Sequence, residues 1–373
     1  MFRFDRRLFE HFDMVLMLVI FLVCIMAFFN LYSASFPPKD YGTAPYIRQA
    51  YFFIAGFAAF VFVISFDYQE LHSWNYPFYG LIILLLLIAF VAGDKAGGAQ
   101  RWINLGFFKL QPSEPAKLML VVTLASYYSR KEISDGYGIK DLFMPVLLTA
   151  VPFVLILLQP DLGTALMLGI IFVSMTVFAK LRISTYITMG SLGLGLGFFA
   201  WEKLLKPYQK QRIQTFLDPE KDPMGHGYQI LQSKIAVGSG GKFGKGYMEG
   251  TQGHLHFLPE RHTDFAFSVW GEEWGFAGSV IFIATYFFLL VWGMYAAMHA
   301  KDRFGVLLAF GVVTLIFWQA VINLFMIMGL LPVVGIPLPL VSYGGSSLLT
   351  TMLGLGILMN VRMRRFQPSM SKE

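Results

Sequence analysis

Long apolar stretches alternate with short polar segments along almost the whole sequence. Most of the apolar stretches approach the length that an α-helix needs to cross a bilayer, roughly 20 residues. We therefore predict an all-α integral membrane protein with about ten transmembrane helices. Their expected ranges are 14–32, 47–66, 78–92, 114–128, 142–158, 162–179, 183–205, 276–298, 305–331 and 346–361. The fifth and sixth are joined only by Gln159-Pro160-Asp161, which predicts a tight helical hairpin with Asp161 as the helix cap.

Residues 206–263 break this pattern between the seventh and eighth predicted helices. A loop of this length is usually functional or disordered, and its glycines and aromatic residues favour function. We predict one polytopic domain over residues 1–373, with 206–263 as a large loop within it. The apolar residues 265–275 that follow fit either a re-entrant segment or the first turns of the eighth helix.

Lys and Arg residues gather in alternate short loops. Because short cytoplasmic loops of membrane proteins are enriched in these residues, both termini are predicted to be cytoplasmic. The long loop then lies outside the membrane, on the extracytoplasmic side. The basic start, the apolar run and Ser33-Ala34-Ser35 also resemble a signal peptide, but Asp5, Glu10 and a span-length run favour a first membrane helix.

Composition narrows the class further. The chain is 56% hydrophobic and 14% charged, and its net charge of +6 comes from residues at helix ends, which does not indicate a nucleic-acid partner. Cys24 is the only cysteine, so no intrachain disulfide can form.

The glycine-rich run 238–246 does not bind a nucleotide in the manner of a P-loop. Ser239 stands where that motif needs its first glycine, and Gly246 follows Lys245 where a serine or threonine is required. Two interpretations stay open: a flexible turn, or a main-chain surface that approaches an anionic substrate closely. His254, His256 and His262 lack the spacing of a closed zinc site, so we predict no protein-bound metal cluster there.

Asp264 lies where the polar loop meets an apolar stretch. Partial desolvation there raises the pKa of a carboxylate and suits it to accept a proton near neutral pH. The alternative is that Asp264 caps the following helix, with Thr263 as a second candidate. Of Glu272 and Glu273, we expect one to face a cavity and the other to face solvent or pair with a base.

Three further polar clusters are predicted to lie at the same outer face. One contains Arg101 and Trp102, and continues to Ser113, a candidate helix cap, and to Glu114 and Lys117. Since Glu114 and Lys117 share one helix face, they either form a structural ion pair or line a wet cavity. A second cluster surrounds Asp161. The third runs from 332 to 347, and its helix start with Ser342 and Ser346 suits an anion such as a diphosphate.

Several of these segments together resemble the SEDS family, named for shape, elongation, division and sporulation. The matching segments are Gly98-Ala-Gln-Arg-Trp-Ile, Leu110-Gln-Pro-Ser-Glu-Pro-Ala-Lys, Gln159-Pro-Asp-Leu-Gly-Thr, Gly227-Tyr-Gln, Leu258-Pro-Glu-Arg-His-Thr-Asp-Phe and Ser342-Tyr-Gly-Gly-Ser-Ser. They occur in order over almost the whole chain, and their wording is most similar to the elongation branch. Ala266 stands where a larger aliphatic residue is expected.

The resemblance implies a peptidoglycan glycosyltransferase in the cytoplasmic membrane of a bacterium, acting in elongation and cell-shape maintenance. Its substrates would be lipid II, a disaccharide-peptide on undecaprenyl diphosphate, and the growing glycan strand. Asp264 would be the general base. The expected substrate-binding residues, which include charged groups that stabilise the leaving diphosphate, are Arg101, Trp102, Glu114, Lys117, Arg212, Lys234, Glu260, His262, Ser342 and Ser346. A divalent cation, Mg²⁺ or Mn²⁺, is an expected cofactor, and a nucleotide is not.

A class B penicillin-binding protein, which is a transpeptidase, and other membrane proteins of the elongation complex are the expected partners. Two other functions fit the same ligand: a flippase for the lipid-linked precursor, and a non-catalytic scaffold for the transpeptidase. A flippase needs polar groups through the membrane, and few are apparent between the outer clusters and the cytoplasmic loops.

Overall fold

The computed structural model describes residues 11–36, 44–96, 99–106, 108–131, 133–222, 225–254 and 257–366. Arg3, Arg6, Arg7 and Lys372, which contribute to the predicted orientation, and His256 lie outside these ranges. Helices occupy every predicted membrane position, which confirms the all-α class. They are α2 (Met14–Ala34), α3 (Pro45–Ser65), α5 (Asn75–Ala92), α6 (Ser113–Arg130), α7 (Phe143–Leu158), α8 (Leu162–Phe178), α9 (Ile183–Phe199), α13 (Ala266–Met298), α14 (Arg303–Ile327) and α15 (Gly345–Met363).

Eight helices within the described residues are long and apolar enough to cross a membrane. They include α7 with its preceding 3₁₀ turn (Ile139–Leu142) and α9 with a following π-helical turn (Ala200–Leu204). The shorter α8 is also apolar, whereas α6 carries Glu114, Lys117 and Arg130. The chain is therefore a multi-pass membrane protein, and the count of ten spans stays a prediction.

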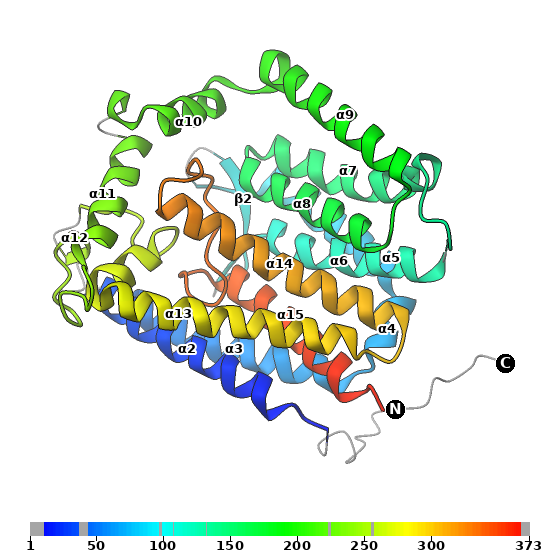
Figure 1. Ribbon diagram of the computed structural model, residues 1–373, viewed down its shortest axis with the longest axis horizontal. Helices are drawn as coiled ribbons and strands as arrows, with labels where there is room; N and C mark the ends of the chain where they lie inside the picture. The colour runs from blue at the N-terminus through cyan, green and yellow to red at the C-terminus, as the bar shows by residue number, and fades with distance from the viewer. Residues whose placement is uncertain are drawn as a thin grey trace.

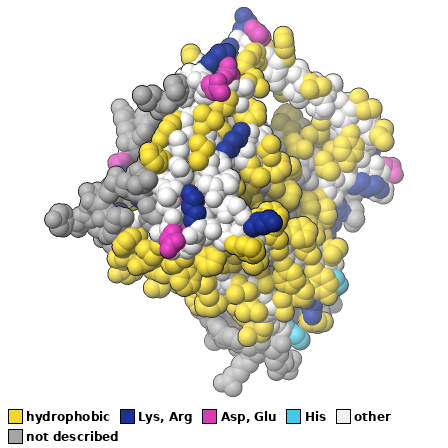
Figure 2. All heavy atoms as spheres, turned by 60° about the vertical axis from the view of Figure 1, so that its left-hand side comes forward, with side chains coloured by type: hydrophobic (Ala, Val, Ile, Leu, Met, Phe, Trp, Pro, Cys, Tyr) yellow, Lys and Arg dark blue, Asp and Glu magenta, His cyan; other side chains and the backbone are white. Residues whose placement is uncertain are grey.

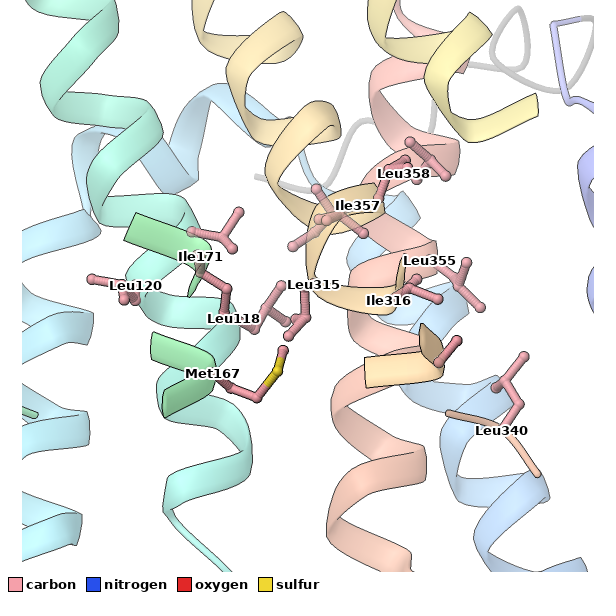
Figure 3. Close-up of a cluster of buried hydrophobic side chains, with 14 of the residues drawn as sticks. Leu118, Leu120, Met167, Ile171, Leu315, Ile316, Leu340, Leu355, Ile357 and Leu358 are labelled. Atoms are coloured by element: carbon pink, nitrogen blue, oxygen red, sulfur yellow. The ribbon is translucent and has the colours of Figure 1, made fainter. Parts of the chain in front are cut away.

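The core of the bundle lies among α6, α8, α14 and α15 (Figure 1). Figure 3 shows their apolar side chains meeting in one cluster, with Leu118 from α6, Met167 from α8, Leu315 from α14 and Leu355 from α15. These side chains are all buried. The helices that carry the polar clusters are thus held against one another by close apolar packing, which in a membrane comes from van der Waals contact rather than from the hydrophobic effect.

Short elements connect the helices at both ends of the bundle. A three-stranded antiparallel sheet of β1 (Asp94–Ala96), β2 (Ala99–Asn104) and β3 (Lys109–Leu110) joins α5 to α6. At the opposite end, the short helix α4 (Tyr68–Ser73) joins α3 to α5, and the buried Tyr68 donates a hydrogen bond to Asp302 before α14. The predicted hairpin of α7 and α8 is confirmed, and Asp161 caps α8 by accepting the Thr164 amide at 3.2 Å.

The long loop contains helices that the sequence analysis did not predict. They are α10 (Pro207–Leu217), a 3₁₀ turn (Pro219–Lys221), α11 (His226–Ser239) and the short α12 (Thr251–His254). With α9 they form an arch: α9 and α10 stand away from the bundle, whereas α11 packs against α13 and α14 (Figure 1). Thr185 is the only buried residue of α9, so this helix contributes little to the core.

Helix α13 is interrupted at Gly275, whose φ of 62° and ψ of −159° are not helical. Residues 266–274 are therefore the first turns of the eighth membrane helix, separated from the rest by a kink. The glycine-rich run restores the lost backbone pairing: Lys245 and Gly246 donate to Glu272 and Glu273, and Phe276 and Ala277 donate to Gly241 and Lys242. A helix break at membrane depth needs such partners.

The glycines in this run allow two backbones to touch. A Cβ at Gly240 would lie 2.1 Å from the Gly271 carbonyl oxygen, and one at Gly244 would lie 2.0 Å from the Glu273 oxygen. The sequence left two interpretations open, a flexible turn or a main-chain surface that approaches the substrate. The structure supports neither of them. Its amides and carbonyls are used to hold the kink in α13.

Candidate active site

Asp264 lies just before α13 and is partly buried. Phe265 occupies the cap position of the helix, and no side chain caps it, so the interpretation of Asp264 as a helix cap is not supported. Within the described ranges, no hydrogen bond or ion pair reaches its carboxylate. A carboxylate in such a place that has no structural partner is a candidate for chemistry.

Burial raises the pKa of Asp264 to about 6. The nearby carboxylates of Glu260 and Asp161 act in the same direction, because a second negative charge favours the protonated form, and the charge of Arg212 opposes them. A carboxyl with this pKa is mostly ionised at neutral pH, yet it accepts a proton more readily than an ordinary aspartate.

The backbone around Asp264 is tied to the segment that leads into α15. The Ser342 hydroxyl donates to the Thr263 carbonyl at 2.6 Å, and the Tyr343 amide donates to the His262 carbonyl at 2.8 Å. The buried Asn323 amide of α14 donates both to the Asp264 carbonyl at 2.9 Å and to the Ile336 carbonyl at 2.8 Å. These hydrogen bonds hold the backbone of residues 262–264 and so fix the position from which the Asp264 side chain extends.

The same segment passes beside the carboxylate itself. Gly335, in the left-handed region with a φ of 73°, would place a Cβ 3.6 Å from Asp264 Oδ2. Its neighbour Val334 lies against the start of α8, where a Cβ on Gly163 would be 2.4 Å from the Val334 oxygen. The prolines and glycines of 332–347 thus bring the chain between Asp264 and the α7–α8 hairpin, in contact with protein on both sides.

A second polar group surrounds the hairpin. Arg101 of β2 donates to the Gln159 carbonyl at 3.0 Å and to the Pro160 carbonyl at 2.6 Å. The Gln111 side chain donates to Asp161 at 3.2 Å, and its backbone amide donates to Ser346 at 3.0 Å. Three of the sequence clusters therefore meet here, and the negative charge of Asp161 connects them to Asp264.

The hydroxyls and the guanidinium in these two groups are largely used within the protein. Ser342 also accepts the Leu338 amide at 2.9 Å, and Ser346 donates to the Lys109 carbonyl at 3.2 Å. Ser342, Ser346 and Arg101 hold loops in place rather than pointing freely at a ligand. The first amides of α15 have no partner within the helix and remain a candidate anion site.

Glu114 and Lys117 form a buried ion pair on α6, with 2.8 Å between Oε1 and Nζ. Their exposed side-chain fractions are only 5% and 2%. This confirms that they share a helix face, and within the described residues neither makes a hydrogen bond or ion pair with Asp264. Ser113 was expected to cap α6, but it is the first helical residue and its buried hydroxyl has no partner among the described atoms.

The remaining predicted residues lie around the arch. Arg212 on α10 is half-buried, and its charge lowers the pKa of Asp264. Lys234 on α11 is exposed, and its side chain packs on Gly329, where a Cβ would lie 2.1 Å from Lys234 Cε. The space-filling view shows a hollow between the arch and the bundle, with Lys and Arg side chains on the surface beside it (Figure 2).

Trp102 lies in β2 opposite Asp94 and is half-buried, and Glu260 is exposed and accepts the Thr263 hydroxyl at 2.9 Å. Glu272 and Glu273 are both fully buried. Glu272 accepts Lys245 Nζ at 2.6 Å, as expected for one of the two, and Glu273 accepts the Ser33 hydroxyl, so neither faces solvent.

Sequence reasoning missed the roles of Asn323 and Asp161. Asn323 is one of a few polar residues in an apolar helix, with Thr314 and Gln319, and Asp161 was assigned to an outer polar cluster only as a helix cap. A signal existed for Asn323, because a fully buried amide in a membrane helix requires partners. Among the described residues, no group of three or more His, Cys, Asp or Glu side chains is placed to hold a metal ion.

Comparison with known proteins gives full-length matches. The family model for cell cycle proteins of the FtsW, RodA and SpoVE type matches residues 13–367. The peptidoglycan glycosyltransferase MrdB of Escherichia coli is 36% identical over 366 residues, which covers 95% of this chain and 94% of that protein. The probable peptidoglycan glycosyltransferase FtsW of Trichlorobacter lovleyi is 38% identical over 362 residues, covering 94% and 93% of the two chains.

Solved structures match over the same length. A chain from a peptidoglycan synthase complex, studied for the structural coordination of polymerization and crosslinking, has a TM-score of 0.82 at 34% identity. It covers 95% of this chain and 99% of its own. The rod shape determining protein RodA of Thermus thermophilus has a TM-score of 0.71 at 30% identity, with 95% and 98% coverage.

Proposed function

We propose that this chain, which belongs to the FtsW, RodA and SpoVE family of cell cycle proteins, polymerises lipid II with Asp264 as the general base. The chain is a peptidoglycan glycosyltransferase, as the names and full-length coverage of its relatives support. The likeness to a rod shape determining protein supports a role in elongation and cell shape. The observation that carries the role of Asp264 is its carboxylate, which no described residue binds and whose pKa burial raises to about 6.

The reaction joins an acceptor sugar hydroxyl to the anomeric carbon of the growing glycan. Asp264 takes the hydroxyl proton, the oxygen forms the new glycosidic bond, and the carbon–oxygen bond to the lipid diphosphate breaks. The diphosphate leaves with the bonding electrons. Asp264 suits the proton transfer because its pKa lies near the working pH, and because Asn323 and Ser342 fix the backbone from which its side chain extends.

The departing diphosphate needs positive charge and amide donors beside it. We propose that Arg212, Lys234 and the first amides of α15 supply them, since Ser342, Ser346 and Arg101 are already bonded within the protein. Under this proposal Trp102, Glu260 and His262 line the path of the sugar, and Glu114 and Lys117 of α6, which pair with each other, also bind substrate.

We propose that a divalent cation, Mg²⁺ or Mn²⁺, arrives with the diphosphate. Mg²⁺ is commonly held by one or two carboxylates together with substrate phosphates, and Asp161 offers one whose charge acts on Asp264. The described residues provide no three-ligand cage, so binding of the metal alone should be weak. If isothermal titration with Mn²⁺ and no lipid gives tight one-to-one binding, this part of the proposal is wrong.

We further propose that the active site faces the extracytoplasmic side of the cytoplasmic membrane and that a class B penicillin-binding protein cross-links the product. The likeness to a chain from a polymerising and crosslinking synthase complex supports such a partner. Co-purification with the transpeptidase encoded by the same organism tests this, and failure to form a complex in detergent and in nanodiscs would argue against it.

The deciding experiment compares glycan products of wild type and Asp264→Asn made from purified lipid II, in the presence of the transpeptidase. We expect loss of polymer by a factor of about 10² to 10⁴, the contribution typical of general-base catalysis. Asp218→Asn, which changes a partly exposed carboxylate paired with Lys221, is the matched control and should retain activity. Full activity of Asp264→Asn would refute the role of Asp264.

The same preparation separates the other two functions. A scaffold predicts that Asp264→Asn supports wall synthesis as long as the complex assembles. A flippase predicts transfer of lipid II between leaflets without glycan product, which can be measured in proteoliposomes with the lipid supplied to one leaflet.

A further inference from the structure

The end of the bundle opposite Asp264 carries a large cavity that the glycosyltransferase reaction does not use. Its volume is about 780 Å³, within the range of small-molecule and lipid sites. It lies where α3 ends, α4 crosses, α5 begins and α15 ends (Figure 1). Both termini are predicted to face the cytoplasm. Because α15, the last helix, ends beside this cavity, this is the predicted cytoplasmic end.

The wall of the cavity is mainly aromatic and opens toward the outer surface of the bundle. Phe62, Trp74 and Phe78 line it and are 62%, 55% and 42% exposed. Phe62 and Phe78 lie at the ends of α3 and α5, which are long and apolar enough to span a membrane, and Trp74 directly precedes α5. Trp side chains are enriched at the level of lipid headgroups, so the exposed Trp74 indicates that the cavity borders lipid.

The polar part of the wall carries more negative than positive charge. Asp67 caps α4 through the Gln69 amide at 3.0 Å and lies 3.6 Å from Arg364. Arg364 also donates to the Phe66 carbonyl and to Asn360, both at 2.8 Å. The charges of Asp67 and Arg364 therefore offset each other. The exposed carboxylate of Glu70, also in the wall, makes no hydrogen bond or ion pair within the described ranges.

We propose that this cavity binds a phospholipid with a primary ammonium headgroup, such as phosphatidylethanolamine. Glu70 receives the ammonium, and the acyl chains run along Phe62, Trp74 and Phe78. A basic peptide from a partner also matches Glu70, but the aromatic wall at the ends of lipid-facing helices favours a lipid. An anionic lipid without an amine has no group to pair with Glu70.

Native mass spectrometry of delipidated protein tests the proposal by titration with three lipids of identical acyl chains. These are palmitoyl-oleoyl phosphatidylethanolamine, phosphatidylcholine and phosphatidylglycerol. We expect the ethanolamine lipid to bind most tightly, because its ammonium can donate hydrogen bonds to Glu70 and the choline headgroup cannot. In Glu70→Gln its advantage over the glycerol lipid should fall about two- to fivefold, as expected for one exposed ion pair.

Two further variants make the result specific. Glu220→Gln removes an exposed carboxylate at the other end of the molecule and should leave the preference unchanged. Trp74→Ala should weaken all three lipids by a similar factor, since it removes wall area without changing charge. An unchanged preference in Glu70→Gln, or equal binding of the three lipids by wild type, overturns the proposal. So does displacement of the lipid by a partner's basic segment.

Discussion

Asp264 combines two costs that a purely structural residue would not carry. Its carboxylate is partly buried, and Glu260 and Asp161 add negative charge nearby. No described side chain compensates it by a hydrogen bond. Destabilising features of this kind persist at functional sites when the surrounding structure holds them in place, and here Asn323 and Ser342 do so through backbone carbonyls.

The first prediction concerns the pH dependence of polymerisation. A general base works only when ionised, so the rate should fall about tenfold per pH unit below a midpoint near the Asp264 pKa of about 6. Removing the negative charge of Glu260 lowers this pKa, so Glu260→Gln should move the midpoint to lower pH. Removing the positive charge of Arg212 raises the pKa of Asp264, so Arg212→Gln should move the midpoint to higher pH. Single-turnover glycan synthesis across pH 4.5–8 measures these shifts, and a midpoint that moves the same way in both variants contradicts the assignment.

The second prediction concerns stability. The pKa of Asp264 is higher in the folded protein than the ordinary value of roughly 3.9 in an unfolded chain. The folded state therefore holds its proton more tightly, and stability falls as pH rises through the interval between about 4 and 6. Asp264→Asn should unfold at a higher temperature than wild type at pH 7.5, while the difference should shrink at pH 4.5. Thermal unfolding of both proteins in detergent checks this, and a lower unfolding temperature at pH 7.5 would contradict it.

Sequence alone identified Asp264 because a polar loop meets an apolar helix at that position, and this boundary is visible in the residue pattern. It did not identify Asn323 as a support for Asp264, because their contact joins positions 59 residues apart. It also assigned Arg101, Ser342 and Ser346 to the substrate, from the family resemblance and from the place of the serines at a helix start. Their actual partners are carbonyls and amides of other loops, which only the tertiary structure reveals.

At the scale of elements, glycines serve opposite purposes in different helices. In α14, a Cβ at Gly311 would lie 2.4 Å from Val121 Cγ1 and 3.0 Å from two atoms of Met175. In α9, a Cβ at Gly193 would meet nothing within 4 Å. One glycine allows helices to approach closely, whereas the other reflects a helix without a packed neighbour at that position.

The third prediction follows from this contrast. Gly311→Ala should destabilise the protein by about 1–3 kcal/mol, the usual cost of overpacking a core. Gly193→Ala should be neutral or slightly stabilising, because alanine favours helix by up to about 1 kcal/mol over glycine. Thermal unfolding in one detergent compares the two. Equal losses would mean that α9 packs against the bundle in solution.

The glycine-rich run shows where element-level prediction fails. Its residue pattern is equally consistent with a mobile turn, an anion site and a close backbone contact. The choice depends on Gly275, which breaks α13 and leaves backbone groups that need partners. Because the run and the kink are separate segments, the periodicity of neither one predicts the contact.

At the scale of the whole molecule, the helix positions were predictable because a bilayer forces the backbone to satisfy its own hydrogen bonds over a fixed thickness. The arrangement of the helices was not. By hydropathy, α9 and α14 both qualify as membrane spans. In the structure α14 is central, whereas α9 stands apart with the arch (Figure 1). Helix packing depends on small residues and shape, which a count of apolar residues does not capture.

The fourth prediction concerns which end of the molecule faces which side of the membrane. The bias of Lys and Arg places the arch outside and the loop between α6 and α7 in the cytoplasm.

Cys24 is the only native cysteine, so Cys24→Ala gives a background without thiols. In that background, Lys221→Cys in the arch and Lys140→Cys near α7 place one exposed thiol at each end. A membrane-impermeant maleimide applied to intact spheroplasts should label the first and spare the second until the membrane is opened. Because both variants replace an exposed lysine, accessibility of the thiol is matched and only sidedness differs. Labelling of Lys140→Cys alone would invert the topology, place Asp264 on the cytoplasmic side, and remove the basis for polymerisation at the outer face.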